Sequence, residues 1–166
     1  MKWTAIVGSW RHTNFDIENQ VREETRSLLA FGNGLVSGGA LGVDFFATDE
    51  ALQADVDASR LKIIIPSMLS TYSAHYLLRA SEGVITRGQA ETLILQLETV
   101  KSMGCLVEGT AQIIDKESYF NRITQIIDLA DELVAFHVNN TEGTQDTINK
   151  ARNKGIRVKI FSYSID

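Results

Sequence analysis

Three short glycine-bearing stretches carry the residues best suited to binding a ligand. They read GSWR at residues 8–11, SGGALG at residues 37–42 and EGT at residues 142–144. The second and third lead directly into helix-like patterns. Glycine leaves the backbone open to a ligand, and the first turn of a helix offers unpaired amide groups to a phosphate. We therefore expect these stretches to bind a phosphate-containing ligand.

Charged and hydroxyl side chains accompany the glycines, and each has a structural alternative. Arg11 suits a phosphate clamp but could be a solvated surface residue. Asp44 could accept a hydrogen bond from a ribose hydroxyl, or only favour the start of its helix. Thr144 and Thr147 fall in the first helical turns, where hydroxyls contact a phosphate or satisfy the helix itself. Arg122 could be exposed or could point at the cleft.

Other motifs are missing or weak. The glycines between Gly38 and Gly42 do not have the spacing of the dinucleotide-binding fingerprint, and no Walker lysine follows them, so they could serve only to form a tight turn. We expect Trp10 to pack a loop rather than stack on a base. Cys105 is the single cysteine and the three histidines are far apart in sequence, so nothing points to a metal. The sequence identifies no cofactor, and we expect only a nucleotide-like ligand.

The elements that would position these residues alternate between strand and helix patterns. Apolar strand-like runs lie at residues 3–8, 35–37, 61–65, 132–138 and 157–163, with a short candidate strand at 105–108. Helical periodicity separates most of them, and Thr13 with Asp16 resembles the start of the first helix. This alternation predicts an α/β fold, with a doubly wound, Rossmann-like, mostly parallel sheet flanked by helices.

Residues 67–104 interrupt the alternation with a pair of helices. The first is expected from Tyr72 to Glu82. The second starts at Thr86 and Gln89, which are spaced as a capping box. This inserted pair could form a lid over the cleft or a dimer surface.

The bulk composition narrows the class of protein. The chain has 166 residues, which fits one domain spanning residues 1–166, and its net charge is -5, which disfavours a broad nucleic-acid surface. No signal peptide and no apolar run of membrane-spanning length is present in these residues. We expect a cytoplasmic protein without a membrane partner.

Four segments together resemble a known family. In order, these are IVGSWR, LVSGGALGVDFFA, YFNRITQIIDLADELVAF and EGTQDTINKARNKGIRV. They are similar to the SLOG superfamily of Rossmann-like domains, which includes DprA-like, YspA-like and LOG-like proteins. The resemblance covers about two thirds of the chain and implies a nucleotide-like ligand in the cleft.

The resemblance also assigns residues by position. Gly8, Ser9 and Arg11 match the first loop of the superfamily, and residues 37–44 match its glycine-rich second loop. Asn121 and Arg122 match a YspA-like pair in reversed order. The complete predicted ligand-binding set is Gly8, Ser9, Arg11, Ser37, Gly38, Gly39, Ala40, Gly42, Asp44, Asn121, Arg122, Gly143, Thr144 and Thr147.

One departure bears on catalysis. LOG-type phosphoribohydrolases carry a glutamate where this chain has Thr147, and a hydroxyl is a poor substitute for that carboxylate. We therefore favour a module that binds a nucleotide or a nucleotide-derived ligand, as a sensor or by sequestering it, and we expect a homo-oligomer. A nucleotide-processing hydrolase using Asp44 or Asp146 and DprA-like binding of single-stranded DNA remain the alternatives.

Overall fold

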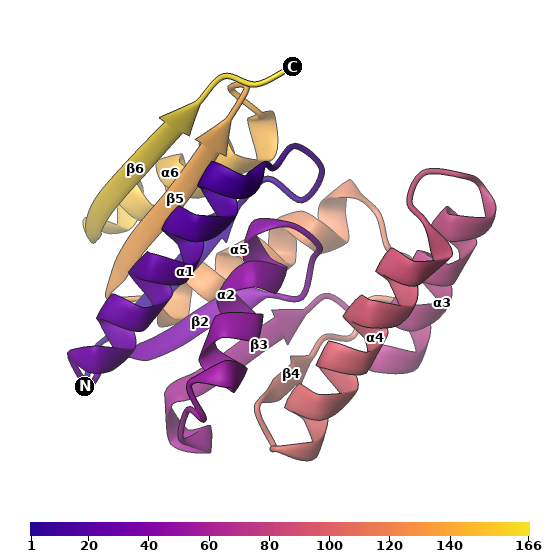
Figure 1. The fold of residues 1–166 in the computed structure, drawn as a ribbon, viewed down its shortest axis with the longest axis horizontal. Coiled ribbons are helices and arrows are strands. Elements are labelled where there is room, and N and C mark those ends of the chain that lie inside the picture. The colour runs from indigo at the N-terminus through magenta and orange to yellow at the C-terminus, as the bar shows by residue number, and fades with distance from the viewer.

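The computed structural model describes residues 1–166 and contains one sheet of six parallel strands, in the order β4-β3-β2-β1-β5-β6. The strands are β1 (Trp3–Gly8), β2 (Gly34–Gly38), β3 (Leu61–Ile65), β4 (Leu106–Glu108), β5 (Glu132–Val138) and β6 (Arg157–Tyr163). The predicted α/β, doubly wound sheet is confirmed, and so is the short strand before residue 109 (Figure 1).

Helices cover both faces of the sheet. They are α1 (Phe15–Ala30), α2 (Val43–Gln53), α3 (Leu69–Ser81), α4 (Arg87–Ser102), α5 (Lys116–Leu129) and α6 (Glu142–Lys154), with a short 3-10 turn at Ala58–Arg60. Helices α1 to α4 contribute to one hydrophobic cluster, and α5 and α6 contribute to the other. None of the helices has both the length and the apolar character needed to cross a bilayer.

β1 lies inside the sheet, paired with β2 on one side and β5 on the other. Successive side chains of a strand point to opposite faces. Accordingly, Ile6 packs in the α1–α4 cluster, while Ala5 and Val7 pack in the α5–α6 cluster. Strand order reverses between β1 and β5, and this is where ligands bind in open α/β sheets.

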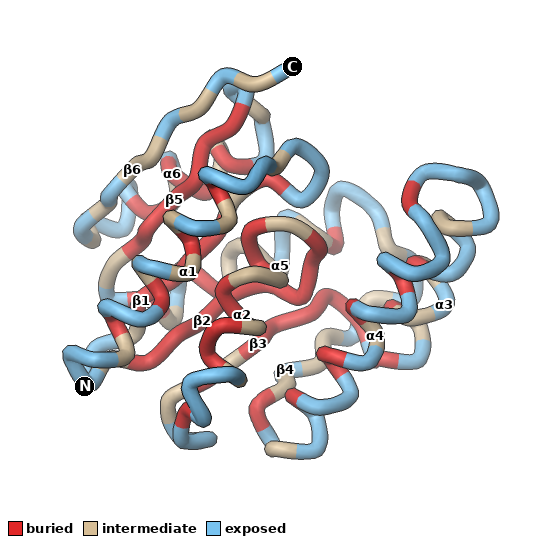
Figure 2. The backbone as a smooth tube through the Cα atoms, in the orientation of Figure 1, coloured by how far each residue is buried: buried red, intermediate tan, exposed pale blue.

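The inserted helices α3 and α4 form a hairpin beside the β3 and β4 end of the sheet, and much of the hairpin surface is exposed (Figures 1 and 2). The first helix begins at Leu69, three residues earlier than expected, because the carboxylate of Glu108 accepts a hydrogen bond from the Leu69 amide at 2.7 Å. The predicted capping box at Thr86 and Gln89 is confirmed.

α1 begins one residue later than the Thr13 start suggested by the sequence. Asn14 is the N-cap, and its side-chain oxygen accepts a hydrogen bond from the amide of Ile17 at 2.9 Å. A capping side chain bonds the amide two or three residues ahead. Asn14 fulfils that spacing and displaces Thr13 from the role.

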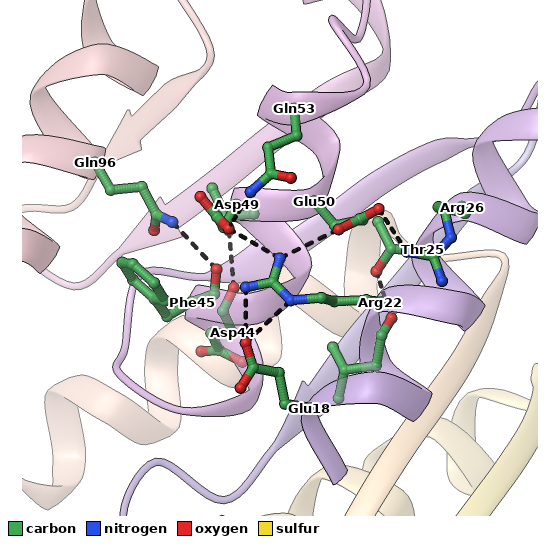
Figure 3. Close-up of polar contacts among 12 residues, drawn as sticks. Glu18, Arg22, Thr25, Arg26, Asp44, Phe45, Asp49, Glu50, Gln53 and Gln96 are labelled. Carbon is green, nitrogen blue, oxygen red and sulfur yellow. Dashed lines mark hydrogen bonds and ion pairs between the residues drawn. The ribbon is translucent and has the colours of Figure 1, made fainter. Parts of the chain in front are cut away.

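A network of charged side chains joins α1 to α2. The Arg22 guanidinium contacts Glu18 at 2.9 Å, Asp49 at 2.8 Å and Glu50 at 3.2 Å, and Arg26 contacts Glu50 at 2.8 Å (Figure 3). The burial of Glu50 would raise its pKa, but the two arginines outweigh it and lower the pKa. The network ties α2 to α1.

Lys154, the last residue of α6, closes the C-terminal end of the neighbouring α5. Its ammonium group donates to the backbone carbonyls of Ile127, Asp128 and Ala130, each at 2.8 Å. The last carbonyls of a helix are left largely without partners inside it, and a cation is favoured at this end of the helix dipole. This contact ties the C-terminal ends of α5 and α6 together.

Candidate functional site

A cavity of about 600 Å³ opens at the carboxyl edge of the sheet, where strand order reverses between β1 and β5. The loops after these two strands contribute to its walls, together with residues of α2, α3, α5 and α6. Nine residues of the predicted ligand-binding set line it, namely Gly8, Ser9, Arg11, Ala40, Asp44, Arg122, Gly143, Thr144 and Thr147. Separate βα corners therefore meet at one cavity.

The cavity is cationic although the chain as a whole is acidic. Arg11, Arg79 and Arg122 line it, and Asp44 is the only carboxylate among its lining residues. His12 and His75 also border it. Burial, reinforced by the nearby charge of Arg79, lowers the pKa of His75, so this side chain is neutral at neutral pH. Local charge therefore favours an anionic ligand.

Arg122 comes from α5 and has unused hydrogen-bonding capacity. Its Nε and Nη1 atoms are buried and have no hydrogen-bond partner. The guanidinium lies over the ring of Tyr119, with its central carbon 5.1 Å from the ring centre. Since buried donors are nearly always paired in folded proteins, Arg122 has hydrogen-bonding capacity that the protein itself does not use.

Asp44 lies in the first turn of α2 and is 5% exposed. Its Oδ1 atom is buried without a hydrogen-bond partner. Burial raises the pKa of Asp44 to about 7, against the opposing effects of the Arg122 charge, the Ser37 hydroxyl and the Ala40 amide. Asp44 is therefore close to half protonated at neutral pH, and its protonated form can donate a hydrogen bond.

Gly38 makes room for these two side chains. A Cβ atom at this position would lie 2.6 Å from Asp44 Oδ2 and 2.8 Å from Arg122 Nη1. Asp44 and Arg122 thus approach the same stretch of bare backbone, although no ion pair joins them. Gly38 does not line the cavity. Because it has no side chain, Asp44 and Arg122 can lie close to the backbone of β2.

The other two glycines of this loop have packing roles. A Cβ on Gly39 would lie 2.5 Å from Ile65 and 2.9 Å from Leu97, so glycine lets α4 approach the sheet closely. Gly42 has a φ of 75° and packs against the backbone of Ser9, where an L side chain is strained. These two glycines therefore serve the packing of the loop and do not line the cavity.

Two further predicted residues lie outside the cavity. The Ser37 hydroxyl donates to the Ile6 carbonyl at 2.7 Å and ties β2 to β1. Asn121 borders a second, neighbouring cavity. A direct role in ligand binding for Ser37, Gly38, Gly39, Gly42 and Asn121 stays a prediction.

The N-terminus of α6 also borders the cavity, through Gly143 and Thr144. Thr141 is the N-cap but makes no side-chain capping bond, and a Cβ on Gly143 would contact nothing within 4 Å. The Thr147 hydroxyl donates to the Gly143 carbonyl at 2.9 Å. The first-turn amides of a helix have no partners within it, so this end offers donors and a positive dipole end to an anion.

Comparison with known proteins identifies the family. The family model described as DNA recombination-mediator protein A matches residues 1–166. The chain belongs to this family. Membership in the DNA recombination-mediator protein A family confirms the resemblance to the SLOG superfamily. No protein of curated function matches the chain significantly.

Solved structures share the fold at low sequence identity. DNA processing protein A from Helicobacter pylori, described with a single-stranded DNA binding mode, is 20% identical with a TM-score of 0.70, and the match covers 96% of this chain and 64% of that one. DNA processing protein A from Streptococcus pneumoniae is 18% identical with a TM-score of 0.53, and the match covers 95% and 58%. The molybdenum cofactor carrier protein from Chlamydomonas reinhardtii is 14% identical with a TM-score of 0.53, and the match covers 98% and 78%. The chain thus spans less than two thirds of either DNA processing protein.

Sequence reasoning raised the α3–α4 hairpin as a lid over the cleft but named none of its residues as part of the site. The cavity residues on this hairpin are His75, Tyr76, Arg79, Val84 and Ile85. The available signal was topological, because a segment that follows a parallel strand starts at the same carboxyl edge as the glycine-bearing loops. The hairpin therefore acts as a side wall of the cavity.

Proposed function

We propose that the cavity binds a nucleotide or a nucleotide-derived ligand that contains phosphate, and that the protein senses or sequesters this ligand. The observation that carries the proposal is Arg122, a cavity-lining arginine with two buried nitrogens that lack partners. A phosphate is the partner best matched to a guanidinium, because it accepts two parallel hydrogen bonds.

The phosphate would lie between Arg122 and the start of α6. The loop after β1 supplies Gly8 and Ser9, and the first turn of α6 supplies Gly143 and Thr144. Backbone amides at a helix start and a permanently charged guanidinium form a common phosphate-binding combination.

The base would lie against the apolar part of the same cavity. Trp10, Tyr76 and Tyr119 supply aromatic rings there, and Val84 and Ile85 supply aliphatic surface. Trp10 is 42% exposed, which leaves its ring available to a ligand. Flat, apolar nucleobases pack well on such rings, so the cationic part and the aromatic part of the cavity match the phosphate and the base of a nucleotide.

Thermal unfolding with a panel of nucleotides tests this function. We expect at least one member of a panel of nucleoside mono- and diphosphates, cyclic nucleotides and ADP-ribose to raise the unfolding midpoint, with a shift that grows with concentration. Arg122→Gln should abolish the shift. Arg152→Gln, an exposed arginine of α6 outside the cavity, should retain it. A wild-type midpoint that no member of the panel moves would overturn the proposal.

Binding of single-stranded DNA is the second candidate function. Family membership and the basic, aromatic lining of the cavity favour it. Single strands are bound by arginines that contact phosphates and by rings that stack on bases. Fluorescence anisotropy with a labelled oligothymidylate at low salt is the test. Unchanged anisotropy at high protein concentration would exclude this function while leaving nucleotide binding open.

The hydrolase alternative now concerns Asp44 more than Asp146, because only Asp44 lines the cavity. Release of free base from nucleoside monophosphates or from NAD, and its loss in Asp44→Asn, would support an enzyme. The proposed homo-oligomer is checked by light scattering at several protein concentrations.

A further inference from the structure

A second cavity lies next to the first and shares one residue with it. It measures about 490 Å³ and lies between the end of β3, the loop before α5, and α5 itself. Pro66 and Thr110 line one side, and Ser118, Asn121 and Gln125 line the other. Arg122 is the only residue that lines both cavities.

The geometry of α5 explains this arrangement. Each residue of an α-helix is rotated by about 100° from the one before it. Tyr119, Ile123 and Ile126 form a stripe that borders the first cavity, whereas Ser118, Asn121 and Gln125 form a stripe that borders the second. Arg122 falls between the two stripes, so it borders both cavities.

The chemistry of the second cavity differs from that of the first. Its free hydrogen-bonding groups include Glu117, Asn121 and Gln125, which are exposed and make no hydrogen bond within the protein. Asp115 adds a second carboxylate, although one of its oxygens already caps α5 by accepting from the Ser118 amide at 2.9 Å. Carboxylates repel phosphate and accept hydrogen bonds from hydroxyl groups, so this lining suits a neutral group rich in hydroxyls.

We propose that the second cavity receives a sugar that is joined, through phosphates held at Arg122, to a nucleoside in the first cavity. The ligand class is then a nucleoside diphosphate that carries a sugar on its terminal phosphate. This inference rests on the proposed function and adds the third part of the ligand. The sugar hydroxyls donate to Glu117 and exchange hydrogen bonds with the amides of Asn121 and Gln125.

Matched ligand pairs test this assignment. Calorimetric titration compares ADP with ADP-ribose, and UDP with UDP-glucose, so that each pair differs only by the sugar. In the wild-type protein we expect the sugar to tighten binding about tenfold in at least one pair. Asn121→Ala combined with Gln125→Ala should remove most of this gain and leave the affinity for the plain diphosphate unchanged. Asn153→Ala, an exposed residue of α6 outside both cavities, should change neither value.

The outcomes separate the two proposals. Tight binding of a diphosphate with no gain from its sugar, or a gain that persists in the double variant, overturns the sugar site and leaves the proposed function standing. If neither diphosphates nor their sugar conjugates bind, the sugar site is overturned, and the thermal-unfolding panel decides separately on the proposed function.

Discussion

Arg22 and Arg122 are both partly buried arginines, but they differ in how many of their nitrogens have hydrogen-bond partners. Arg22 contacts three carboxylates of α1 and α2, namely Glu18, Asp49 and Glu50 (Figure 3). Arg122 leaves Nε and Nη1 unpaired, and Asp44, at the other end of α2, leaves Oδ1 unpaired nearby. The same pair of residue types therefore forms a complete network at one end of α2 and an incomplete one at the other.

The difference separates a structural role from a binding role. A paired set such as that of Arg22 stabilises the packing of two helices. An unpaired buried polar group destabilises the free protein by about 1–3 kcal/mol. Such groups persist where something outside the fold supplies the missing partners. We therefore expect substitutions at the two arginines to have opposite effects on stability and on binding.

The largest effect on ligand affinity is expected for Arg122→Gln. Loss of a bidentate, charged contact to phosphate should weaken nucleotide binding about 100-fold, or about 2.7 kcal/mol. The free energy of unfolding without ligand should stay the same or rise, because buried unpaired nitrogens are removed. Calorimetry and urea unfolding measure the two quantities. A loss of stability comparable to the loss of affinity would show that Arg122 is structural.

Arg22→Met should give the reverse result. The free energy of unfolding should fall by about 3 kcal/mol, because Asp49 and Glu50 lose a shared partner in a partly buried setting. Nucleotide affinity measured well below the unfolding midpoint should not change. Arg26→Met is the matched control and should cost less, since the Arg26 side chain is 54% exposed against 19% for Arg22.

Asp44→Asn should stabilise the free protein at alkaline pH. The pKa of Asp44 is raised to about 7 in the folded protein, against about 4 in the unfolded chain. Ionised Asp44 therefore destabilises the fold, and the free energy of unfolding falls as pH rises from about 4 through 7. The variant should therefore be about 4 kcal/mol more stable than wild type at pH 8 and equal to it near pH 4, since each unit of the pKa difference is worth about 1.4 kcal/mol. Urea unfolding at both values is the measurement. An equal difference at the two pH values would contradict the pKa shift.

The smallest effect is expected for Gly38→Ala. The added methyl group would press on the ends of two flexible side chains, Asp44 and Arg122, rather than on backbone. Nucleotide affinity should fall about fivefold, or about 1 kcal/mol, with a smaller change in stability. Gly88→Ala is the control, since Gly88 lines neither cavity and a Cβ there would meet only the Thr86 hydroxyl at 3.8 Å. If Gly38→Ala leaves affinity intact, Arg122 does not need its present position to bind ligand.

The sequence predicted the strands and the sheet well because each element follows from a local pattern of residues. Apolar runs separated by helical periodicity identify β1, β2, β3, β5 and β6, and a parallel sheet follows from their alternation. The meeting of the corners after β1 and β5 follows from the same rule, since parallel strands place their carboxyl ends at one edge. Thr13 was the wrong cap because two adjacent residues can both cap a helix, and only backbone geometry decides between them.

The site was harder to predict because its parts are distant in sequence. Tyr76 and Val84 join the cavity only through the packing of the α3–α4 hairpin, and no local periodicity encodes that placement. The glycines of residues 38–42 have the composition of a phosphate loop, yet their close contacts are with Ile65, Leu97 and the charged side chains. Composition alone does not distinguish a glycine that admits a ligand from one that admits a neighbouring helix.

Few polar contacts attach the hairpin to the rest of the molecule. They include the 3.1 Å hydrogen bond from Gln96 to the Phe45 carbonyl of α2 and the cap that Glu108 of β4 provides for Leu69. The hairpin residues along the cavity can therefore diverge during evolution without disturbing the strands or the start of α6. Under the proposed function, exchange of residues 69–102 between family members would change the organic part of the ligand that is recognised. The contacts proposed for its phosphate, at Arg122 and at the start of α6, would stay in place.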